Sequence, residues 1–596
     1  MNHLWLIACM FSFVYIGKAQ VVINEVCTHN ASVVNDLDGD TPDWVELYNA
    51  GVANEDISGF GLSDENSSVK YIFPPFTLAP GQFKLIFISD KNLYGTQWHT
   101  NFQLKKGETL YLFNYTGAIL DQLNGDELHD NDSRGRYPDG AGTCYFDVPT
   151  PGASNNTSTA YSGYTANVQA NYAPGFYAAA INLTMSSVSA GAQIHYTVNG
   201  NKALASSPVC TALAINQTTT VRSVAVATGL LPSEEYIATY FINANHNLPV
   251  ISIITDSLHL WDYDSGIFVM GPGASSTPPY YGANFWLDLE YPAVFELYQN
   301  QSLVFSQQIG LAIHGGSVNR QQPMKSLRLT ARDKYSKKKM EYPFFEERTN
   351  VEYEELVLRN GSSDFCLSHM RDELTAENLF KETANDVLVS RPAIAYINGV
   401  YWGIYNLKEK RGKYNLAQVH NVDEDSLDII RDNIYAWEGD TLAFHTMHNY
   451  VMTHDLSNNA FYNVFSSHMD IENFTDYYIG EIYYGNFDWP YGNIECWRER
   501  KPGSKFRYIF FDLDVAFTGT PWQDHTYNLW TKIFSDYCDP NKHINLFEAA
   551  LTNTGFHHNF VNRYCDLLNT IFTPEHQLQK VGARENAISG EVNHHF

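Results

Sequence analysis

The pattern of apolar residues changes near Pro249, and this change constrains the fold more than any other feature of the chain. Before it, short runs such as VVINEV, WVELYN and AQIHYTVNG alternate apolar and polar residues between Gly, Asn and Asp turns. Such alternation is typical of strands with one buried face. After Pro249, strand-like runs are mixed with longer stretches of helical periodicity. The chain is therefore expected to begin all-β and to end α+β.

The length of the chain implies more than one hydrophobic core. A single core stops growing at roughly 250–300 residues, whereas this chain has 596 residues, of which 44% are hydrophobic. The stretch PTPGASNNTSTAYSG has the composition of a linker, because it can bury little apolar surface. We expect β-sandwiches at 20–156 and 164–244, followed by an α+β domain at 249–596.

Residues 1–19 are predicted to be a signal peptide. An apolar run at 4–16 precedes Gly17 and Ala19, which are small residues of the kind that cleavage requires. About a dozen apolar residues are too few to cross roughly 30 Å of hydrocarbon comfortably. A buried N-terminal helix or a short anchor is the alternative. No later segment is apolar enough to span a membrane. The protein is expected to be secreted or at the cell surface, with no integral membrane span after signal removal.

The net charge of −28 argues against nucleic-acid partners, because binding to phosphate backbones requires a basic surface. The eight cysteines are scattered, with no CxxC pair and no spacing suited to zinc. Free thiols and one or two disulfides both remain open, and so does the oligomeric state.

Two family resemblances cover the all-β part. The runs INEV, DGDTPDWVELYN, GFGLSDE and RYPDG resemble a lamin-tail domain, which implies an immunoglobulin-like binding or spacer module without catalysis. GFYAAAINLTM, IHYTVNG and SSPVC resemble the C-terminal sandwich of chitobiases and hexosaminidases. That sandwich sits beside catalytic domains and does not itself hydrolyse sugar. The second segment contains no pair of acidic residues that would suggest a glycosidase.

The run NDLDGD contains Asp36, Asp38 and Asp40, and this spacing can place several carboxylates around a calcium ion. The rest of an EF-hand loop, including a Glu at its twelfth position, is missing. A solvated acidic turn is the simpler alternative.

The run GNFDWPYGN carries the strongest chemical signal in the chain. Within it, Asp488 and Asn493 have the Asp-x4-Asn spacing of a kinase catalytic loop. Such a carboxylate takes the proton of an acceptor hydroxyl, and the amide oxygen reaches a magnesium ion. Asp512 and Asp514 follow the apolar run KFRYIFF, where Asp512 would hold the metal that bridges the nucleotide phosphates. Each spacing also occurs by chance, so their order along the chain supports the hypothesis more than any one of them.

The segments before this loop follow the order of a protein kinase. Lys325 in MKSLRL would neutralise phosphates, unless it is simply a solvated strand residue. A long helix is predicted within 369–388, and Glu373 falls amid its apolar stripe, where an unpaired carboxylate would be costly. AIAYINGVYWGIYNLKEK predicts a hairpin around Asn398-Gly399. Glu409 follows it, where a kinase chain passes the adenine.

Successive blocks in this order resemble the CotH (spore coat protein H) kinase family: PVISIITD with GIFV, HGGSVNRQQPMKSLRL, MRDELT, AYINGVYWGIYNLKEK, GNFDWPYGN and FFDLDVAF. The resemblance covers the chain from about Pro249 to its end. It implies an atypical protein-kinase-like fold that uses ATP and Mg²⁺. Carried over by position, it makes Asp488 the catalytic carboxylate and Asn493 and Asp512 metal ligands, with Asp514 beside them.

The resemblance also assigns upstream residues. It gives Lys325 a phosphate contact and makes Arg371 and Asp372 the motif of the helix, whereas helical periodicity points to Glu373. The acidic partner of Lys325 therefore stays open. No GxGxxG loop is present, so the run HGGS with Arg320 nearby is expected to cradle the phosphates. Its absence fits an atypical kinase and equally an inactive pseudokinase.

Three functions follow from these patterns. The favoured one is an exported kinase that transfers phosphate from Mg-ATP to Ser or Thr of a secreted or surface protein. The first rival is an inactive kinase-like scaffold for adhesion or surface assembly. The second is a carbohydrate-associated surface protein, suggested by the chitobiase-like segment.

Overall fold

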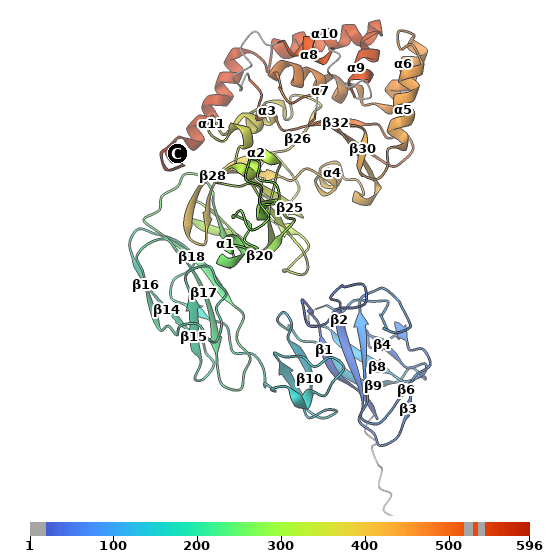
Figure 1. Ribbon diagram of the computed structural model, residues 1–596, viewed down its shortest axis with the longest axis vertical. Helices are drawn as coiled ribbons and strands as arrows, with labels where there is room; N and C mark the ends of the chain where they lie inside the picture. Colours follow the sequence, from blue (N-terminus) through green and yellow to red (C-terminus); the bar gives the residue numbers. More distant parts are fainter. Residues whose placement is uncertain (1–19, 106, 491, 518–527, 535–542, 596) are drawn as a thin grey trace, which may run out of the picture.

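The structure is a computed structural model that describes residues 20–105, 107–490, 492–517, 528–534 and 543–595. The predicted signal peptide at 1–19 lies outside the described residues. Within them, no helix is both long and apolar enough to cross a membrane. The fold comprises two N-terminal β-sandwiches and a C-terminal half of mixed strands and helices, as the sequence predicts (Figure 1).

The first sandwich packs a five-stranded sheet, in the order β11-β10-β1-β2-β7, against a four-stranded sheet, β5-β4-β8-β9. Its strands are β1 (Val21–Cys27), β2 (Asp43–Asn49), β3 (Glu55–Asp56), β4 (Gly61–Ser63), β5 (Tyr71–Ile72), β6 (Thr77–Leu78), β7 (Phe83–Ile88), β8 (Thr109–Phe113), β9 (Ile119–Asn124), β10 (Ser133–Arg136) and β11 (Thr143–Phe146). Alternate residues such as Val45 and Leu47 face the core.

The prediction of a linker at PTPGASNNTSTAYSG needs correction, because the first half of this segment belongs to the first sandwich. Thr150 donates a hydrogen bond from its backbone N–H to Glu25, and the buried Asn155 side chain donates to the carbonyl of Asn24. The composition of the segment allowed no apolar burial, but its polar groups are satisfied by buried partners instead.

The second sandwich pairs the three strands β12-β14-β16 with the four strands β13-β18-β17-β15. Its strands are β12 (Gln169–Ala170), β13 (Gly175–Tyr177), β14 (Ile181–Ser186), β15 (Gln193–Thr197), β16 (Ala212–Ile215), β17 (Thr219–Val226) and β18 (Tyr236–Ile242). Buried and exposed residues alternate strictly along β14, as a half-buried strand requires.

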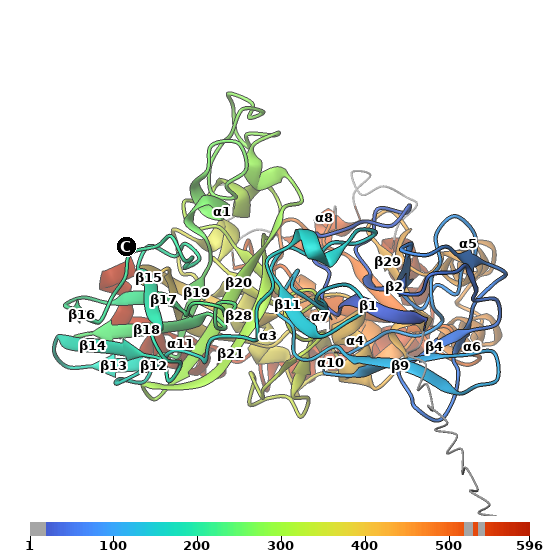
Figure 2. The same ribbon diagram turned by 90° about the horizontal axis from the view of Figure 1, so that it is seen from below.

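A closed seven-stranded barrel follows, in the order β19-β20-β21-β22-β25-β28-β27 (Figures 1 and 2). Its strands are β19 (Val250–Ile254), β20 (Glu290–Gln299), β21 (Ser302–Ile313), β22 (Leu327–Thr330), β25 (Glu355–Arg359), β27 (Ser390–Ile397) and β28 (Val400–Glu409). Parallel pairing of β19 with β27 closes it. The predicted hairpin at Asn398-Gly399 joins β27 to β28; both residues have positive φ, as its turn requires.

The helical half is built around the sheet β26-β32-β31-β29-β30. Its strands are β26 (Asp386–Val387), β29 (Leu427–Arg431), β30 (Tyr435–Glu438), β31 (Glu495–Glu499) and β32 (Arg507–Phe510), and β23 (Met340–Glu341) pairs with β24 (Glu352–Tyr353) beside the barrel. The helices are α1 (Ser257–Trp261), α2 (Ser317–Gln321), α3 (Arg371–Leu379), α4 (Lys413–His420), α5 (Leu442–Thr453), α6 (Asn459–His468), α7 (Ile471–Tyr484), α8 (Leu529–Ile533), α9 (Ile544–Leu551), α10 (Thr554–Leu568) and α11 (Pro574–His595). The aromatic face of α7 packs on β32 through Tyr477 and Tyr508, whose rings are stacked.

The prediction of one long helix within 369–388 is wrong. Helix α3 ends at Leu379, Phe380 has extended dihedrals and Lys381 has a φ of 64°. The chain then forms β26, which pairs in parallel with β32. The pairing of β26 with β32, which is distant in sequence, outweighs the local preference for a helix.

Candidate active site

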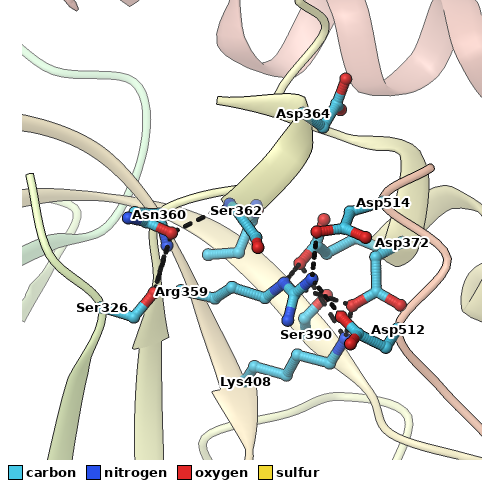
Figure 3. Close-up of polar contacts among 12 residues, drawn as sticks. Ser326, Arg359, Asn360, Ser362, Asp364, Asp372, Ser390, Lys408, Asp512 and Asp514 are labelled. Carbon is cyan, nitrogen blue, oxygen red and sulfur yellow. Dashed lines mark hydrogen bonds and ion pairs between the residues drawn. The ribbon is translucent and has the colours of Figure 1, made fainter. Parts of the chain in front are cut away.

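Part of the predicted site lies where the barrel meets the helical half. Asp512 and Asp514 follow β32, Asp488 and Asn493 lie in the loop after α7, and α3 supplies Asp372. Figure 3 shows Arg359 and Lys408, from the barrel wall, pointing toward Asp372, Asp512 and Asp514.

Arg359, the last residue of β25, is the centre of this cluster. Its Nη2 lies 2.9 Å from Oδ1 of Asp512 and 3.4 Å from Oδ2 of Asp514. Its Nε lies 3.3 Å from Asp372 and 3.7 Å from Glu373. One guanidinium group thus joins the carboxylates that follow β32 to those of α3.

Lys408 of β28 is the second cation. Its ammonium group forms a hydrogen bond with Asp372 and lies 3.9 Å from Glu373. Asp372 also accepts the backbone N–H of Leu513 at 3.0 Å. Burial acts to raise the pKa of Asp372, but the charges of Lys408 and Arg359 outweigh it and hold that pKa below its usual range. Asp372, from the family pattern, and Glu373, from helical periodicity, therefore both face the cluster.

Asp514 is buried more deeply than Asp512. Its side chain accepts the backbone N–H of Ser363 at 2.9 Å. Burial and the neighbouring charge of Asp512 raise the pKa of Asp514 to about 7. Asp512 keeps 34% of its side chain exposed, compared with 5% for Asp514. Of the two, Asp512 is the one that a ligand in solution can reach.

The loop after α7 presents Asp488 and Asn493 without protein partners. Neither side chain makes a hydrogen bond or ion pair with another part of the described chain, and one carboxylate oxygen of Asp512 is likewise unbonded there. Desolvation and the charge of nearby Asp512 raise the pKa of Asp488, which is nevertheless solvent-exposed. Carboxylate and amide oxygens are the ligands that Mg²⁺ prefers. The side chains of Asp512 and Asn493 therefore fit a magnesium ion.

The backbone at this site is held in a sparsely populated conformation. Asp512 has a φ of 62° and Asn493 a φ of 60°. Non-glycine residues in this region carry strain that surrounding contacts must outweigh, and such residues concentrate at functional sites.

Hydrogen bonds of buried side chains fix the loop that follows α7. Asn486 donates to Oε2 of Glu481 at 3.0 Å, and Trp489 donates from Nε1 to the hydroxyl of Tyr477 at 2.9 Å. Lys532 of α8 donates to the carbonyls of Phe487 and Trp489. Burial raises the pKa of Glu481 well above its usual value, which favours its neutral form.

Lys325 lies apart from the acidic cluster. Its ammonium group donates to the carbonyl of Arg320 at 2.7 Å and lies 4.0 Å from the ring centroid of Phe285. Burial and the charge of Arg320 lower the pKa of Lys325 to about 8. No carboxylate of the described chain lies within ion-pair distance of Lys325. Asp372 and Glu373, between which its acidic partner was left open, lie beside Lys408 and Arg359 instead.

Three other predicted residues have partners away from the cluster. Arg371 lies 3.3 Å from Asp364, beside the start of α3. Arg320 donates to the carbonyl of Gly315 at 2.8 Å and to that of Phe285. Glu409 binds Arg348 through both carboxylate oxygens, at 2.8 and 2.7 Å.

A cavity of about 210 Å³ lies beside this Arg348–Glu409 pair, between α4 and the segment that follows α3. Arg348, Leu388 and Leu416 are among the residues that line it, but none of the predicted catalytic or metal-binding residues does. Glu409 lies on the opposite face of β28 from Lys408 because successive side chains of a strand alternate. Arg411, which packs on Phe511 directly before Asp512, also lines the cavity, so the cavity lies close to the acidic cluster.

Basic residues line the barrel side of the site. His314, the first residue of the HGGS run, directly follows β21. Burial and the charges of Lys410, Arg359, Arg328 and Arg411 lower its pKa. The guanidinium of Arg411 lies 3.5 Å from the ring centroid of Phe511. Arg328 lies within 4 Å of Asp288, Glu290 and Glu355, and Arg411 within 4 Å of Glu495, so carboxylates offset part of this positive charge.

Sequence reasoning missed Arg359, Lys408 and Arg411. Strand alternation carries a signal for the first two. Leu358 and Leu407 are paired across β25 and β28 and face the barrel core, so Arg359 and Lys408 must face outward together. The pairing of the two strands, which makes these cations neighbours, is not visible in either segment alone.

Asp36, Asp38 and Asp40 do converge, with ligand oxygens within 4.8 Å of one another. The ammonium group of Lys91 bonds all three, at 2.5, 2.8 and 2.7 Å. A calcium ion would have to displace this lysine, so calcium binding here stays a prediction.

Three family models match parts of the chain. The model of the CotH kinase protein family matches residues 311–596, that of the Lamin Tail Domain matches 16–125, and that of the chitobiase/beta-hexosaminidase C-terminal domain matches 172–238. All three resemblances are confirmed, in the expected order. The first match begins inside β21 and includes every residue of the acidic cluster. No curated protein matches the chain significantly.

Proposed function

Since residues 311–596 carry a CotH kinase domain, we propose that the protein is an exported atypical kinase. It transfers the terminal phosphoryl group of ATP to a Ser or Thr hydroxyl of a secreted or surface protein. The domain match supports a kinase-like function. The lamin-tail and chitobiase-type modules are compatible with an extracellular protein.

The observation that carries this proposal is the contrast between bound and unbound oxygens at the site. Asp372, Glu373 and Asp514 lie within 4 Å of Arg359 or Lys408, whereas Asp488 keeps an unbonded carboxylate. The contacts with Arg359 and Lys408 keep the surrounding carboxylates in place. The unbonded carboxylate of Asp488 is then available to act on a substrate.

Asp488 takes the proton of the acceptor hydroxyl, and loss of this proton makes the hydroxyl oxygen a better nucleophile. Asn493 and Asp512 would hold Mg²⁺, which neutralises phosphate charge when it is bound. Arg328, Lys410 and Arg411, whose charges surround His314, would offer positive charge to the phosphates.

Calorimetric titration of Mg-ATP into the full chain tests the assignment. The wild type is expected to show saturable binding, and Asp512→Ala to weaken it about tenfold or more, since a metal ligand is lost. Asp488→Asn is expected to bind nucleotide but to lose transfer by about 10²–10⁴-fold, because the proton acceptor is removed.

Asp455→Ala is the matched control, since Asp455 lies between α5 and α6 and bonds only its own turn. It should bind and transfer like the wild type. Undiminished transfer by Asp488→Asn in a direct phosphorylation assay would remove Asp488 from its proposed role.

A second candidate is an inactive scaffold, and one contact favours it. Arg359 bonds both Asp512 and Asp514, so a guanidinium group already supplies charge that a metal ion would otherwise supply. If the wild type binds no Mg-ATP, the scaffold becomes the better assignment.

A further inference from the structure

Helix α11 lies along α3, the helix that supplies Asp372 and Glu373. Gln577 accepts a hydrogen bond from Asn378 at 3.0 Å. Glu377 of α3 then lies 3.6 Å from Lys580 and 3.6 Å from Arg584, at successive turns of α11. Figure 1 shows α11 descending from the helical half to the side of the barrel.

Arg584 reaches the barrel as well as α3. It is buried, with 8% of its surface exposed. Its Nη2 donates to Oδ1 of Asn406 at 3.3 Å and to the hydroxyl of Ser390 at 3.4 Å. Asn406 lies two residues before Lys408 on the same face of β28. The guanidinium group of Arg584 therefore connects α3 to the strand whose lysine binds Asp372.

Arg584 also acts on the charge of the cluster. Burial raises the pKa of Glu373, and Arg584 is one of the cations, with Lys408 and Arg359, whose charge opposes that rise. Arg584 thus lies close enough to Glu373 to affect its ionisation, although no direct contact joins them.

The far end of α11 is anchored on the junction between the second sandwich and the barrel. Oε1 of Glu591 lies 2.8 Å from Nδ1 of His246, which follows β18, and Nε2 of His246 lies 2.8 Å from the hydroxyl of Tyr396. His595 accepts the backbone N–H of Ile404 at 3.0 Å. The helix is therefore fixed at one end to the junction and along its length to α3.

One apolar cluster is shared by these parts. It contains Phe241 of the second sandwich, residues of the barrel and Ile588 of α11, and Met370 packs against it directly before α3. The rings of Phe241 and Tyr396 meet edge to face, with centroids 4.9 Å apart. The start of α3 thus rests on a core to which the second sandwich contributes.

We propose that Arg584 is a positioning residue of the active site, which fixes α3 against β28 through Glu377 and Asn406. Helix α11 carries it, and the Glu591–His246 contact at the sandwich junction holds that helix in place. The inference rests on the proposed function in so far as the acidic cluster is the site of phosphoryl transfer. Its structural consequence, an α3 that is mobile without Arg584, can be measured without nucleotide.

Hydrogen exchange of the full chain tests the positioning role. Arg584→Met is expected to speed exchange of the α3 amides about tenfold, because the contacts to Glu377 and Asn406 are both lost. It should also weaken binding of Mg-ATP about tenfold, while the amides of β14 in the second sandwich exchange as in the wild type. Arg584→Lys, which keeps the charge, should show a smaller change of about threefold in both.

Lys580→Met is the matched control, since Lys580 contacts the same Glu377 but does not reach Asn406. Its α3 exchange and Mg-ATP binding should match the wild type. Wild-type α3 exchange in both Arg584 variants would overturn the proposal; if Arg584→Met does not fold, Arg584→Lys alone decides by the same criterion. Failure of the wild type to bind Mg-ATP would count against the proposed function and leave the exchange test intact.

Discussion

At the scale of single residues, the site depends on how buried charges are shared. Arg359 and Lys408 lie within 4 Å of four carboxylates, those of Asp372, Glu373, Asp512 and Asp514. Removing one member of a buried ion pair costs more than the pair contributes, because the other charge is left without compensation. Replacing any one member of the cluster is therefore expected to leave another buried charge without compensation.

Lys408→Met is expected to lower the free energy of unfolding by about 3–5 kcal/mol, because Asp372 would lose its closest cation in a buried site. Urea denaturation, compared with the wild type, measures the loss. Lys410→Met is the control: its ammonium group bonds the carbonyl of the adjacent Arg411, and a change below about 1 kcal/mol is expected. Equal effects of the two variants would contradict a special role for the Lys408–Asp372 pair.

The candidate site was only partly predictable at this scale. The Asp-x4-Asn spacing predicts the roles of Asp488 and Asn493, and both residues lie in the loop after α7. The cation of the site was expected at Lys325, yet Lys408 and Arg359 bind the acids of α3. Lys325 comes before β22 and Lys408 lies near the end of β28, and only strand pairing decides which one faces α3.

At the scale of elements, α3 is short and begins without a capping side chain of its own. Its N-cap residue, Met370, makes no side-chain hydrogen bond to the helix. Asp364 takes that role from the preceding turn, where its Oδ2 accepts the backbone N–H groups of Met370 and Arg371 at 2.8 and 3.1 Å. A carboxylate there also suits the positive end of the helix dipole.

Asp364→Ala is expected to lower the free energy of unfolding by about 1–2 kcal/mol, the usual cost of losing a helix cap. Asp364→Asn, which keeps an acceptor oxygen without the charge, should lose less. Thermal denaturation of the three proteins under identical conditions checks this order. An alanine variant as stable as the wild type would show that α3 is held by its packing alone.

At the scale of the whole molecule, the second sandwich and the barrel meet through buried polar groups as well as through a shared apolar cluster. Glu296 of β20 is 1% exposed and accepts the hydroxyl of Thr239 of β18 at 2.9 Å. Tyr298 donates to the same carboxyl oxygen at 2.9 Å. Burial raises the pKa of Glu296 to about 7, against the opposing effect of these hydrogen bonds.

This raised pKa predicts that the junction weakens as pH rises. A carboxyl whose pKa rises from 4.5 to about 7 on folding binds its proton more tightly in the folded chain. Its contribution is therefore full below pH 4.5 and is lost as pH rises through 7, a change of about 3 kcal/mol. Thermal denaturation between pH 5 and 8 should show a smaller decline for Glu296→Gln than for the wild type. Parallel curves for the two proteins would contradict the prediction.

The sequence by itself determined the order of the modules, the hairpin at Asn398-Gly399 and the spacing of the loop that carries Asp488. These features depend on alternation, turn residues and short separations, all of which are local. The tertiary structure decided that α3 stops at Leu379, that 149–155 joins the first sandwich, and that Arg359 meets Asp512 across 153 positions. Such outcomes depend on segments that are distant in sequence and become neighbours only on folding. A buried charge or polar group without a partner is costly, so the fold must supply that partner wherever it lies in the sequence.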